Sequence, residues 1–333
     1  MRARPYILFM VLGGLLFLLF TLDMMTGSLD VSFGDVWGAL MGEGDAATVK
    51  IVRHIRLIKA VVAVLVGASL SVSGLQMQTL FRNPLAGPYV LGITSGASLG
   101  VALLILGAPL LGVTFGALGA FGVAGAAWVG AALILMVTAA VGARIKDIMV
   151  VLILGMMFSS GVGAAVQVLQ YLSHEEALKT FVVWTMGALG DVTSAQLLVF
   201  VPAVAVGLVL AVVVVKPLNL MLLGEQYAVT MGLDMRRSRL LIFLSTTLLA
   251  GTVTAFCGPI GFIGLAVPHL ARALFASVDQ RVLVPGSVLI GACMMLVCDM
   301  LAKRFLLPIN AVTSLMGIPV VVWIVMKNKN MVS

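Results

Sequence analysis

The sequence predicts an all-α polytopic membrane protein with about ten transmembrane helices, and three observations lead to this fold class. Of the 333 residues, 62% are hydrophobic and only 10% are charged, whereas soluble domains carry roughly 25% charged residues. Long uncharged stretches follow one another, the longest from Asn83 to Ala143, and a span needs only about 20 apolar residues. Strand-like alternation is absent, so helices rather than a β-barrel should satisfy the backbone.

We read residues 1–333 as a single transmembrane domain whose spans follow one another in chain order. Their expected bounds are Tyr6–Leu22, Leu57–Leu80, Tyr89–Leu106, Val113–Val141, Ile148–Leu172, Ser194–Val215, Leu240–Cys257, Ile260–Phe275, Val282–Leu301 and Ile309–Met326. The first span follows Arg2 and Arg4 without an A-x-A-like cleavage site, so we expect it to be retained rather than removed as a signal peptide. The eighth is short and contains Pro268, which predicts a broken or half-buried helix.

The distribution of Lys and Arg predicts the orientation. With ten spans, most basic loop residues fall on one side together with both termini, and the positive-inside rule makes that side the cytoplasm. These residues are Arg82, Arg144, Lys146, Arg236, Arg237, Arg239, Arg272, Arg281, Lys327 and Lys329. A smaller basic set falls on the opposite side: Arg53, Arg56, Lys59, Lys303 and Arg304. The net charge of +7 is therefore explained by membrane topology and gives no reason to expect a nucleic-acid partner.

One polar insert interrupts the apolar sequence. It reads KPLNLMLLGEQYAVTMGLDMRRSR, residues 216–239, and is the largest predicted cytoplasmic loop. Apolar residues recur in it at helical spacing: Leu220, Leu223, Tyr227 and Met231. Gly224 and Gly232 interrupt the pattern, which predicts two short helices lying against the membrane face. The alternative is a solvated amphipathic loop.

The sequence lacks the groups that would drive transport by itself. No lysine follows a glycine, so no Gly-x-x-x-x-Gly-Lys phosphate-binding loop is present. An ion-coupled carrier buries carboxylates within its spans, and here they hold almost none, with Asp299 at an end. By elimination, the energy should come from a partner that docks on the polar insert.

Catalytic and metal sites are not expected either. The three histidines, His54, His174 and His269, lie far apart in the sequence. The cysteines lie in or beside apolar runs and read as small buried hydrophobic residues. We therefore expect no enzyme activity, no metal and no cofactor in this chain.

Four stretches carry a more specific signal. They are RLIKAVVAVLVGASLSVSGLQMQTLFRNPLAGPYVLGITSGA from Arg56, LLGEQYAVTMGLDMRRSR from Leu222, GPIGFIGLAVPHLARALF from Gly258 and LPINAVTSLMGIPVVVWIV from Leu307. Together they resemble the permease subunits of type II ABC importers, the family that takes up iron–siderophores, haem and cobalamin. The chain departs from the family pattern at Ile58 and Lys59, where Pro-Arg is usual, and at Ile309 and Asn310, where Val-Gly follows the proline.

The resemblance implies a ten-helix permease of the bacterial inner membrane that pairs with a second copy of itself around one translocation path. Two cytoplasmic ABC ATPase subunits would bind ATP and magnesium, and a periplasmic or lipid-anchored binding protein would deliver an iron chelate (siderophore or haem) or cobalamin. Membrane lipids would surround the dimer. The alternatives are a stand-alone ion-coupled secondary transporter or channel, or a membrane scaffold without transport activity.

The resemblance also assigns residues. The ATPase coupling segment would cover residues 217–238 and use Leu220, Leu223, Gly224, Glu225, Gln226, Ala228, Met231 and Gly232. Binding-protein docking would use Arg56, Lys59 and Lys303, with helix-end snorkelling as the alternative. A cytoplasmic gate would use Asn83, Pro84 and Leu85, with a plain turn as the alternative. Candidates for the path are Gln167, Gln170, Met186 and Ser314.

Overall fold

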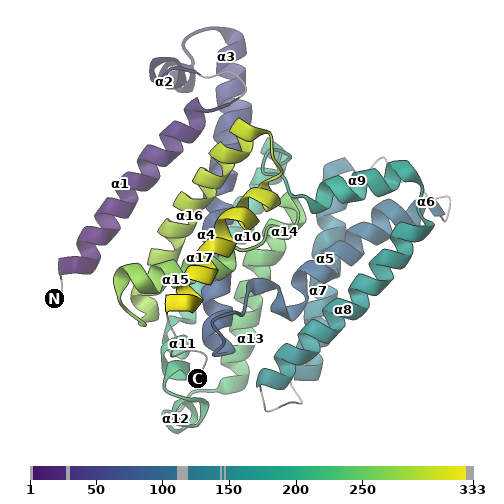
Figure 1. The fold of residues 1–333 in the computed structure, drawn as a ribbon, viewed down its shortest axis with the longest axis vertical. Coiled ribbons are helices and arrows are strands. Elements are labelled where there is room, and N and C mark those ends of the chain that lie inside the picture. The colour runs from purple at the N-terminus through teal and green to yellow at the C-terminus, as the bar shows by residue number, and fades with distance from the viewer. Residues whose placement is uncertain (1–2, 28–30, 111–118, 143–144, 146–147, 328–333) are drawn as a thin grey trace.

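The computed structural model describes residues 3–27, 31–110, 119–142, 145 and 148–327, and this part of the chain is built almost entirely from helices. The helices that cross the bundle are α1 (Ala3–Met25), α4 (Leu57–Leu80), α5 (Ile93–Ala102), α7 (Gly119–Gly142), α8 (Ile148–Leu172), α10 (Ser194–Val213), α13 (Met235–Thr246) continued by α14 (Thr252–Cys257), α15 (Ile263–Phe275), α16 (Gln280–Phe305) and α17 (Ile309–Lys327). Their order follows the predicted spans (Figure 1).

The lengths of these helices support a multi-pass membrane protein. Within the described residues, seven are long and apolar enough to cross a membrane, and three shorter apolar helices cover Ile93–Gly107, Ile263–Phe275 and Ile309–Trp323. The shorter ones include the span that was expected to be broken: α15 has 13 residues and contains Pro268. Single π-helical turns, η1 (Val52–Arg56), η3 (Leu103–Gly107) and η5 (Thr247–Gly251), adjoin α4, α5 and α14.

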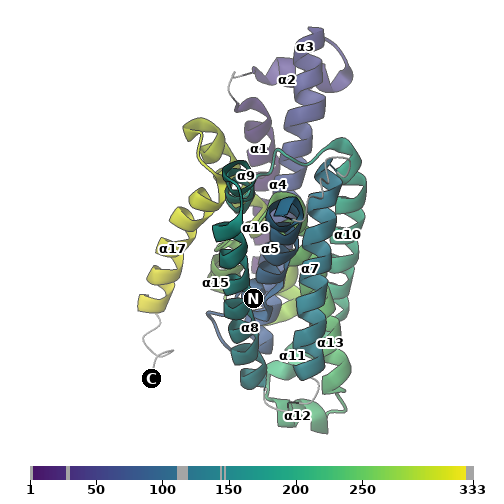
Figure 2. The same cartoon turned by 90° about the vertical axis from the view of Figure 1, so that its right-hand side faces the viewer.

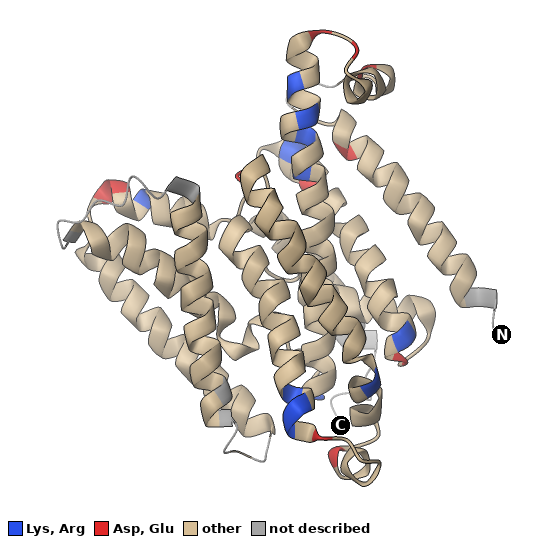
Figure 3. Cartoon of the chain, turned by 180° about the vertical axis from the view of Figure 1, so that it is seen from behind, with Lys and Arg blue, Asp and Glu red and all other residues tan. Residues whose placement is uncertain are grey.

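Short helices lie at the two ends of the bundle. At one end are α2 (Phe33–Met41), α3 (Ala46–Ile51) and α9 (Glu175–Thr185), and at the other are α11 (Val215–Leu222) and α12 (Glu225–Thr230) (Figures 1 and 2). We call the second the connector end, because α11 and α12 lie in the stretch that connects α10 to α13. Among the residues that the structure describes, the charged ones gather at both ends and leave the middle of the bundle uncharged, as Figure 3 shows. This distribution is what a bilayer around the middle requires, because charged groups are costly in hydrocarbon.

The core is centred on α4, which packs against α15 and α16 through glycines. A Cβ atom built on Gly74 would lie 1.7 Å from the carbonyl oxygen of Gly264, and one on Gly67 would lie 2.1 Å from that of Gly291. The backbones are therefore in direct contact, as at small-residue interfaces between membrane helices. Gly96 and Gly100 approach α7 in the same way, at Gly130 and Ala126.

Backbone amide and carbonyl groups in the extended stretch before α15 form specific hydrogen bonds. The Gly261 amide donates to Oδ1 of Asn310 at 3.0 Å, and the Tyr89 hydroxyl donates to the Ile260 carbonyl. The Ala188 amide donates to the Cys257 carbonyl at 2.8 Å. Irregular backbone inside a membrane protein needs such partners because lipid offers none.

We expect Gly74→Ala to destabilise the fold strongly. The added methyl group has no room beside the Gly264 backbone, and overpacking against backbone costs about 3 kcal/mol. Thermal unfolding in detergent should show a large drop in Tm. The matched control is Gly125→Ala on α7, where a Cβ meets nothing within 4 Å. Equal Tm values for the two variants would contradict the packing described here.

Candidate functional site

The polar insert forms a connector between α10 and α13, residues 214–234. Its two helices, α11 and α12, are separated by Gly224, whose φ of 121° and ψ of 144° are open to glycine but not to residues with a side chain. Gly232 has a φ of 84° and follows α12. Asp234 then caps α13 by accepting a hydrogen bond from the Arg237 amide at 3.0 Å. The predicted pair of short helices with breaks at Gly224 and Gly232 is confirmed.

Hydrogen bonds fix the connector to three spanning helices. Arg82, just beyond α4, donates to the Met221 carbonyl at 2.7 Å. Asn219 donates to Asp279 Oδ1 at 2.7 Å and accepts from the Gln280 amide at 2.9 Å, which ties α11 to the start of α16. Arg239 on α13 forms an ion pair with Glu225 at 2.7 Å. These contacts couple the connector to α4, α13 and α16.

The outer surface of the connector is apolar. Exposed side chains on it are Leu222, Leu223, Tyr227, Val229 and Met231. Ala228 is fully buried, so it packs the segment internally, whereas its predicted role was contact with a partner. Gln226 and Gly232 are exposed, and Leu220 and Glu225 are half-buried. Figures 1 and 2 place α12 beyond the ends of the spanning helices. An apolar patch at this position is typical of a protein-docking surface.

A turn next to the connector holds the residues predicted to form a gate. Asn83 Oδ1 accepts a hydrogen bond from the Leu85 amide at 2.9 Å, an Asx-turn that ends the α4 segment. His269 Nε2 on α15 lies 2.8 Å from the Pro84 carbonyl. The Leu85 side chain is exposed. The turn is therefore held on one side by α15, while Leu85 projects away from the chain.

The same end of α4 is bonded to α15 through side chains. Gln78 donates from Nε2 to the Leu265 carbonyl at 3.1 Å and accepts from Arg272 Nη1 at 2.6 Å. Both contacts cross from α4 to α15, five residues before Asn83. Together with the His269–Pro84 contact they join the loop, the end of α4 and α15.

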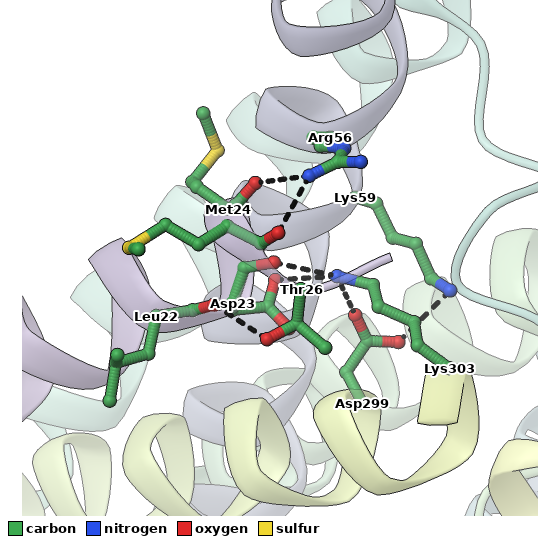
Figure 4. A network of polar contacts seen from close by, with 9 residues as sticks. Leu22, Asp23, Met24, Thr26, Arg56, Lys59, Asp299 and Lys303 are labelled. Atoms are coloured by element: carbon green, nitrogen blue, oxygen red, sulfur yellow. Dashed lines mark hydrogen bonds and ion pairs between the residues drawn. The ribbon is translucent and has the colours of Figure 1, made fainter. Parts of the chain in front are cut away.

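A buried charge network lies at the opposite end, where α1, α4 and α16 meet (Figure 4). Lys303 contacts Asp23 at 2.8 Å and Asp299 at 2.7 Å, and Lys59 contacts Asp299 at 3.1 Å. Arg56 donates to the carbonyls of Met24 and Met25, both at 2.9 Å, and so caps the end of α1. Both carboxylates are almost completely buried.

The network contains all three residues that were predicted to dock a binding protein. In this chain Arg56, Lys59 and Lys303 already have intramolecular partners, and only Lys59 has a side chain with sizeable exposure, 23%. Acidic groups on a partner would therefore have to compete with Asp23 and Asp299. Docking stays a prediction, and the observed role of these cations is to join three helices.

The four residues proposed for the translocation path lie on two different parts of the molecule. Gln167 is exposed and Gln170 half-buried on α8. Met186 follows α9, and its carbonyl accepts from the Asn310 amide at 3.3 Å at the start of α17. Ser314, one turn later, donates to the Asn310 carbonyl at 2.7 Å. The structure thus brings Met186 and the Ser314 turn together.

Comparison with known families gives a decisive match. The model of the FecCD transport family covers residues 15–327, nearly the whole chain. The chain belongs to the FecCD transport family. Members of this family are transport permeases rather than enzymes, in agreement with the apolar helices and the expected lack of a catalytic site.

Named relatives extend over nearly the full length of this FecCD member. It is 36% identical to the hemin transport system permease protein HmuU of Yersinia pestis, over 98% of both chains. It is 34% identical to the Fe(3+) dicitrate transport system permease protein FecC of Escherichia coli, over 97% of both. It is 35% identical to the vitamin B12 import system permease protein BtuC of Serratia proteamaculans, over 99% of this chain and 95% of that one.

A solved structure shares the fold. A metal-chelate type ABC transporter in an inward-facing conformation superposes with a TM-score of 0.84, at 29% identity, over 96% of this chain and 99% of that chain. The predicted type II ABC importer permease fold is confirmed by this likeness together with the family match.

Sequence reasoning missed the acidic half of the charge network. Asp299 was noted only as lying at the end of a span, and no role was assigned to Asp23. The available signal was their position, since each lies near the end of an apolar run on the side that carries Lys59 and Lys303. Asn310 was noted only as a departure from the family pattern, yet it bonds Gly261 and Met186.

We expect Asp299→Asn to lower stability by about 3 kcal/mol, because removing one partner from a buried ion pair leaves the other charge uncompensated. Lys59 and Lys303 would both lose a carboxylate at 3.1 and 2.7 Å. Thermal unfolding in detergent measures the change. The control Arg237→Gln breaks an exposed ion pair with Asp234, which should cost well under 1 kcal/mol. A network without structural importance would give the same small shift in both.

Proposed function

We propose that this chain is the permease subunit of an ATP-driven importer in the bacterial inner membrane, moving an iron chelate (siderophore or haem) or cobalamin into the cytoplasm. The names of the relatives point to this cargo range, since they are permeases for hemin, ferric dicitrate and vitamin B12. The observation that carries the proposal is the connector: an exposed apolar patch on a segment bonded to three spanning helices.

The connector supplies what an ATPase subunit would need. Its exposed apolar side chains offer contact area, and Glu225 is held by Arg239 at its edge. Two such subunits, one under each copy of the permease, would bind ATP and magnesium. Because hydrogen bonds join the connector to α4 and α16, movement of an ATPase would be transmitted to the centre of the bundle.

Charge supports a cytoplasmic position for the connector end. Basic residues outnumber acidic ones there. The basic residues are Arg82, Lys216, Arg236, Arg237, Arg239, Arg272 and Arg281, and the acidic ones are Glu225, Asp234 and Asp279. The positive-inside rule places such an end in the cytoplasm. Both termini would then be cytoplasmic as well.

A second copy of the chain would complete the path. The helices α8 and α17 expose many large apolar side chains, including Met157, Tyr171 and Leu315. Gln167 on α8 and Ser314 on α17 add sparse polar groups. We infer that these faces meet a second copy and border a wide, weakly polar path, with Leu85 at its cytoplasmic end.

The rival function is a stand-alone ion-coupled carrier, which needs ionisable carboxylates along its path. The two buried acids of the charge network, Asp23 and Asp299, lie at the outer end and are paired with Lys59 and Lys303. Such pairing suits a structural network better than a cation site. The geometry therefore favours an external energy source.

The deciding experiment is reconstitution of the chain with its ATPase and binding-protein partners in liposomes. Uptake of haem, a ferric siderophore or cobalamin should require internal ATP and binding protein outside. Uptake that needs neither, and follows a proton or sodium gradient, would establish the rival carrier. Liposomes that take up no cargo under either condition would point to a scaffold.

Leu223→Asp should uncouple the ATPase while leaving the permease folded. Leu223 is exposed on the connector, and loss of a central apolar contact weakens a protein interface by roughly thirtyfold or more. Co-purification of the ATPase and ATP-dependent uptake should both fall. Phe33→Asp is the control, because Phe33 is equally exposed but lies on α2 at the opposite end. An unchanged ATPase affinity in Leu223→Asp would exclude the connector as the docking surface.

A further inference from the structure

A groove lies between α10 and α16 near the connector end. It has a volume of about 600 Å³, within the range of roughly 300–1,000 Å³ that is typical of small-molecule sites. Apolar side chains form most of its wall, including Leu208 and Val212 from α10 and Val288 from α16. Val212 is exposed, so the groove opens on the outer surface of the bundle.

The depth of the groove matches one leaflet of a bilayer. Its lining on α16 extends from Gln280, the first residue of the helix, to Leu289. At 1.5 Å per residue this is about 13 Å, close to half of a hydrocarbon core of about 30 Å. The groove therefore reaches from the membrane surface to near the mid-plane, as the acyl chain of a lipid does.

The mouth of the groove is basic. Arg281 lines it and has an exposed side chain, for which the structure shows no acidic partner among the described residues. Asp279, the nearest acid in the sequence, accepts from Asn219 Nδ2 at 2.7 Å and from the Arg281 backbone amide at 2.9 Å. Lys216, also exposed, follows the lining residue Val215. Basic residues at this depth attract anionic headgroups.

Gln280, which also lines the groove, is bonded to α4. Its Nε2 donates to Thr79 Oγ1 at 3.1 Å, and the Thr79 hydroxyl donates to the Leu75 carbonyl at 2.8 Å. Because that hydroxyl proton is used, Thr79 can only accept from Gln280, which fixes the orientation of the amide. Gln280 Oε1 is buried and has no hydrogen-bond partner among the described residues, so headgroup selection is left to Arg281 at the mouth of the groove.

We propose that this groove binds one molecule of phosphatidylglycerol from the leaflet at the connector end. An acyl chain fills the apolar wall and the phosphate contacts Arg281. Phosphatidylcholine has a phosphate but no net negative charge. The site needs only the membrane setting and not the proposed cargo or ATPase, so it can fail or hold independently of the proposed function.

A second groove provides an internal comparison. It lies between α1 and α4 and is lined by apolar residues and glycine alone, such as Gly13, Phe17 and Val64. With no charged or hydrogen-bonding side chain in its lining, it offers no basis for headgroup selection. No preference for phosphatidylglycerol is therefore expected at this second groove.

The test is lipid titration of the purified, delipidated chain, followed by native mass spectrometry with phosphatidylglycerol, phosphatidylethanolamine and phosphatidylcholine of matched acyl chains. Phosphatidylglycerol should bind roughly fivefold more tightly than phosphatidylcholine. This is the gain in affinity expected when one basic residue contacts an anionic lipid. Equal binding of these two lipids, or binding of phosphatidylethanolamine as tight as that of phosphatidylglycerol, overturns the assignment of an anionic lipid.

Two variants locate the site. Arg281→Gln should remove the preference, whereas Arg237→Gln, which takes a charge from an exposed residue outside the groove, should keep it. Val288→Trp should fill the groove and reduce binding of every lipid at this site, and a melting curve checks that this variant is folded. If the preference for phosphatidylglycerol survives in Arg281→Gln, the groove is excluded as its source. Because Arg281 is exposed, this substitution should leave the fold intact.

Discussion

The backbone contact of α4 with α15 and α16 is the constraint on which the rest of the structure depends. Lipid tails are as apolar as leucine side chains, so membrane helices gain little from burying apolar surface against one another. Close packing must supply the stabilisation that apolar burial does not provide. The paired glycines Gly67–Gly291 and Gly74–Gly264 allow this close packing. Since α4 is fixed in this way, the residues at both of its ends have fixed positions too.

The functional features of the molecule are attached to this central unit. At one end, Arg82 and Gln78 join α4 to the connector and to α15. At the other, Lys59 joins it to Asp299 on α16. The helix α16 also runs between these two ends. Gln280 at its start is bonded to the connector, and Lys303 near its end belongs to the charge network. Two packed helices therefore link the faces where an ATPase and a binding protein are proposed to act.

The fold was largely predictable because its signals are local. Length and apolarity of each run are sufficient to place most spans, and Gly224 and Gly232 mark the breaks of the connector because only glycine suits that backbone. Pro268 likewise marks the short α15. The helices α2, α3 and α9 were not foreseen, since with 9, 6 and 11 residues they are too short to be recognised as spans.

The candidate sites were predictable only in part, because partner choice depends on residues distant in sequence. Glu225 was assigned to an ATPase contact, and its ion pair with Arg239 could not be inferred from spacing. The same holds for Arg56, Lys59 and Lys303, whose partners lie on α1 and α16. Ala228 shows the limit at a single position: helical spacing places it near the apolar stripe, and tertiary packing decides that it faces inward.

The brevity of α15 has a consequence for biosynthesis. Its 13 residues extend about 20 Å, too short to be recognised and released into lipid as an independent unit by the insertion machinery. Gly261, in the stretch just before α15, donates its amide hydrogen bond to Asn310, which is synthesised later. Gly261 can therefore gain this partner only after the start of α17 has been synthesised, so α17 contributes to the assembly of the segment before α15.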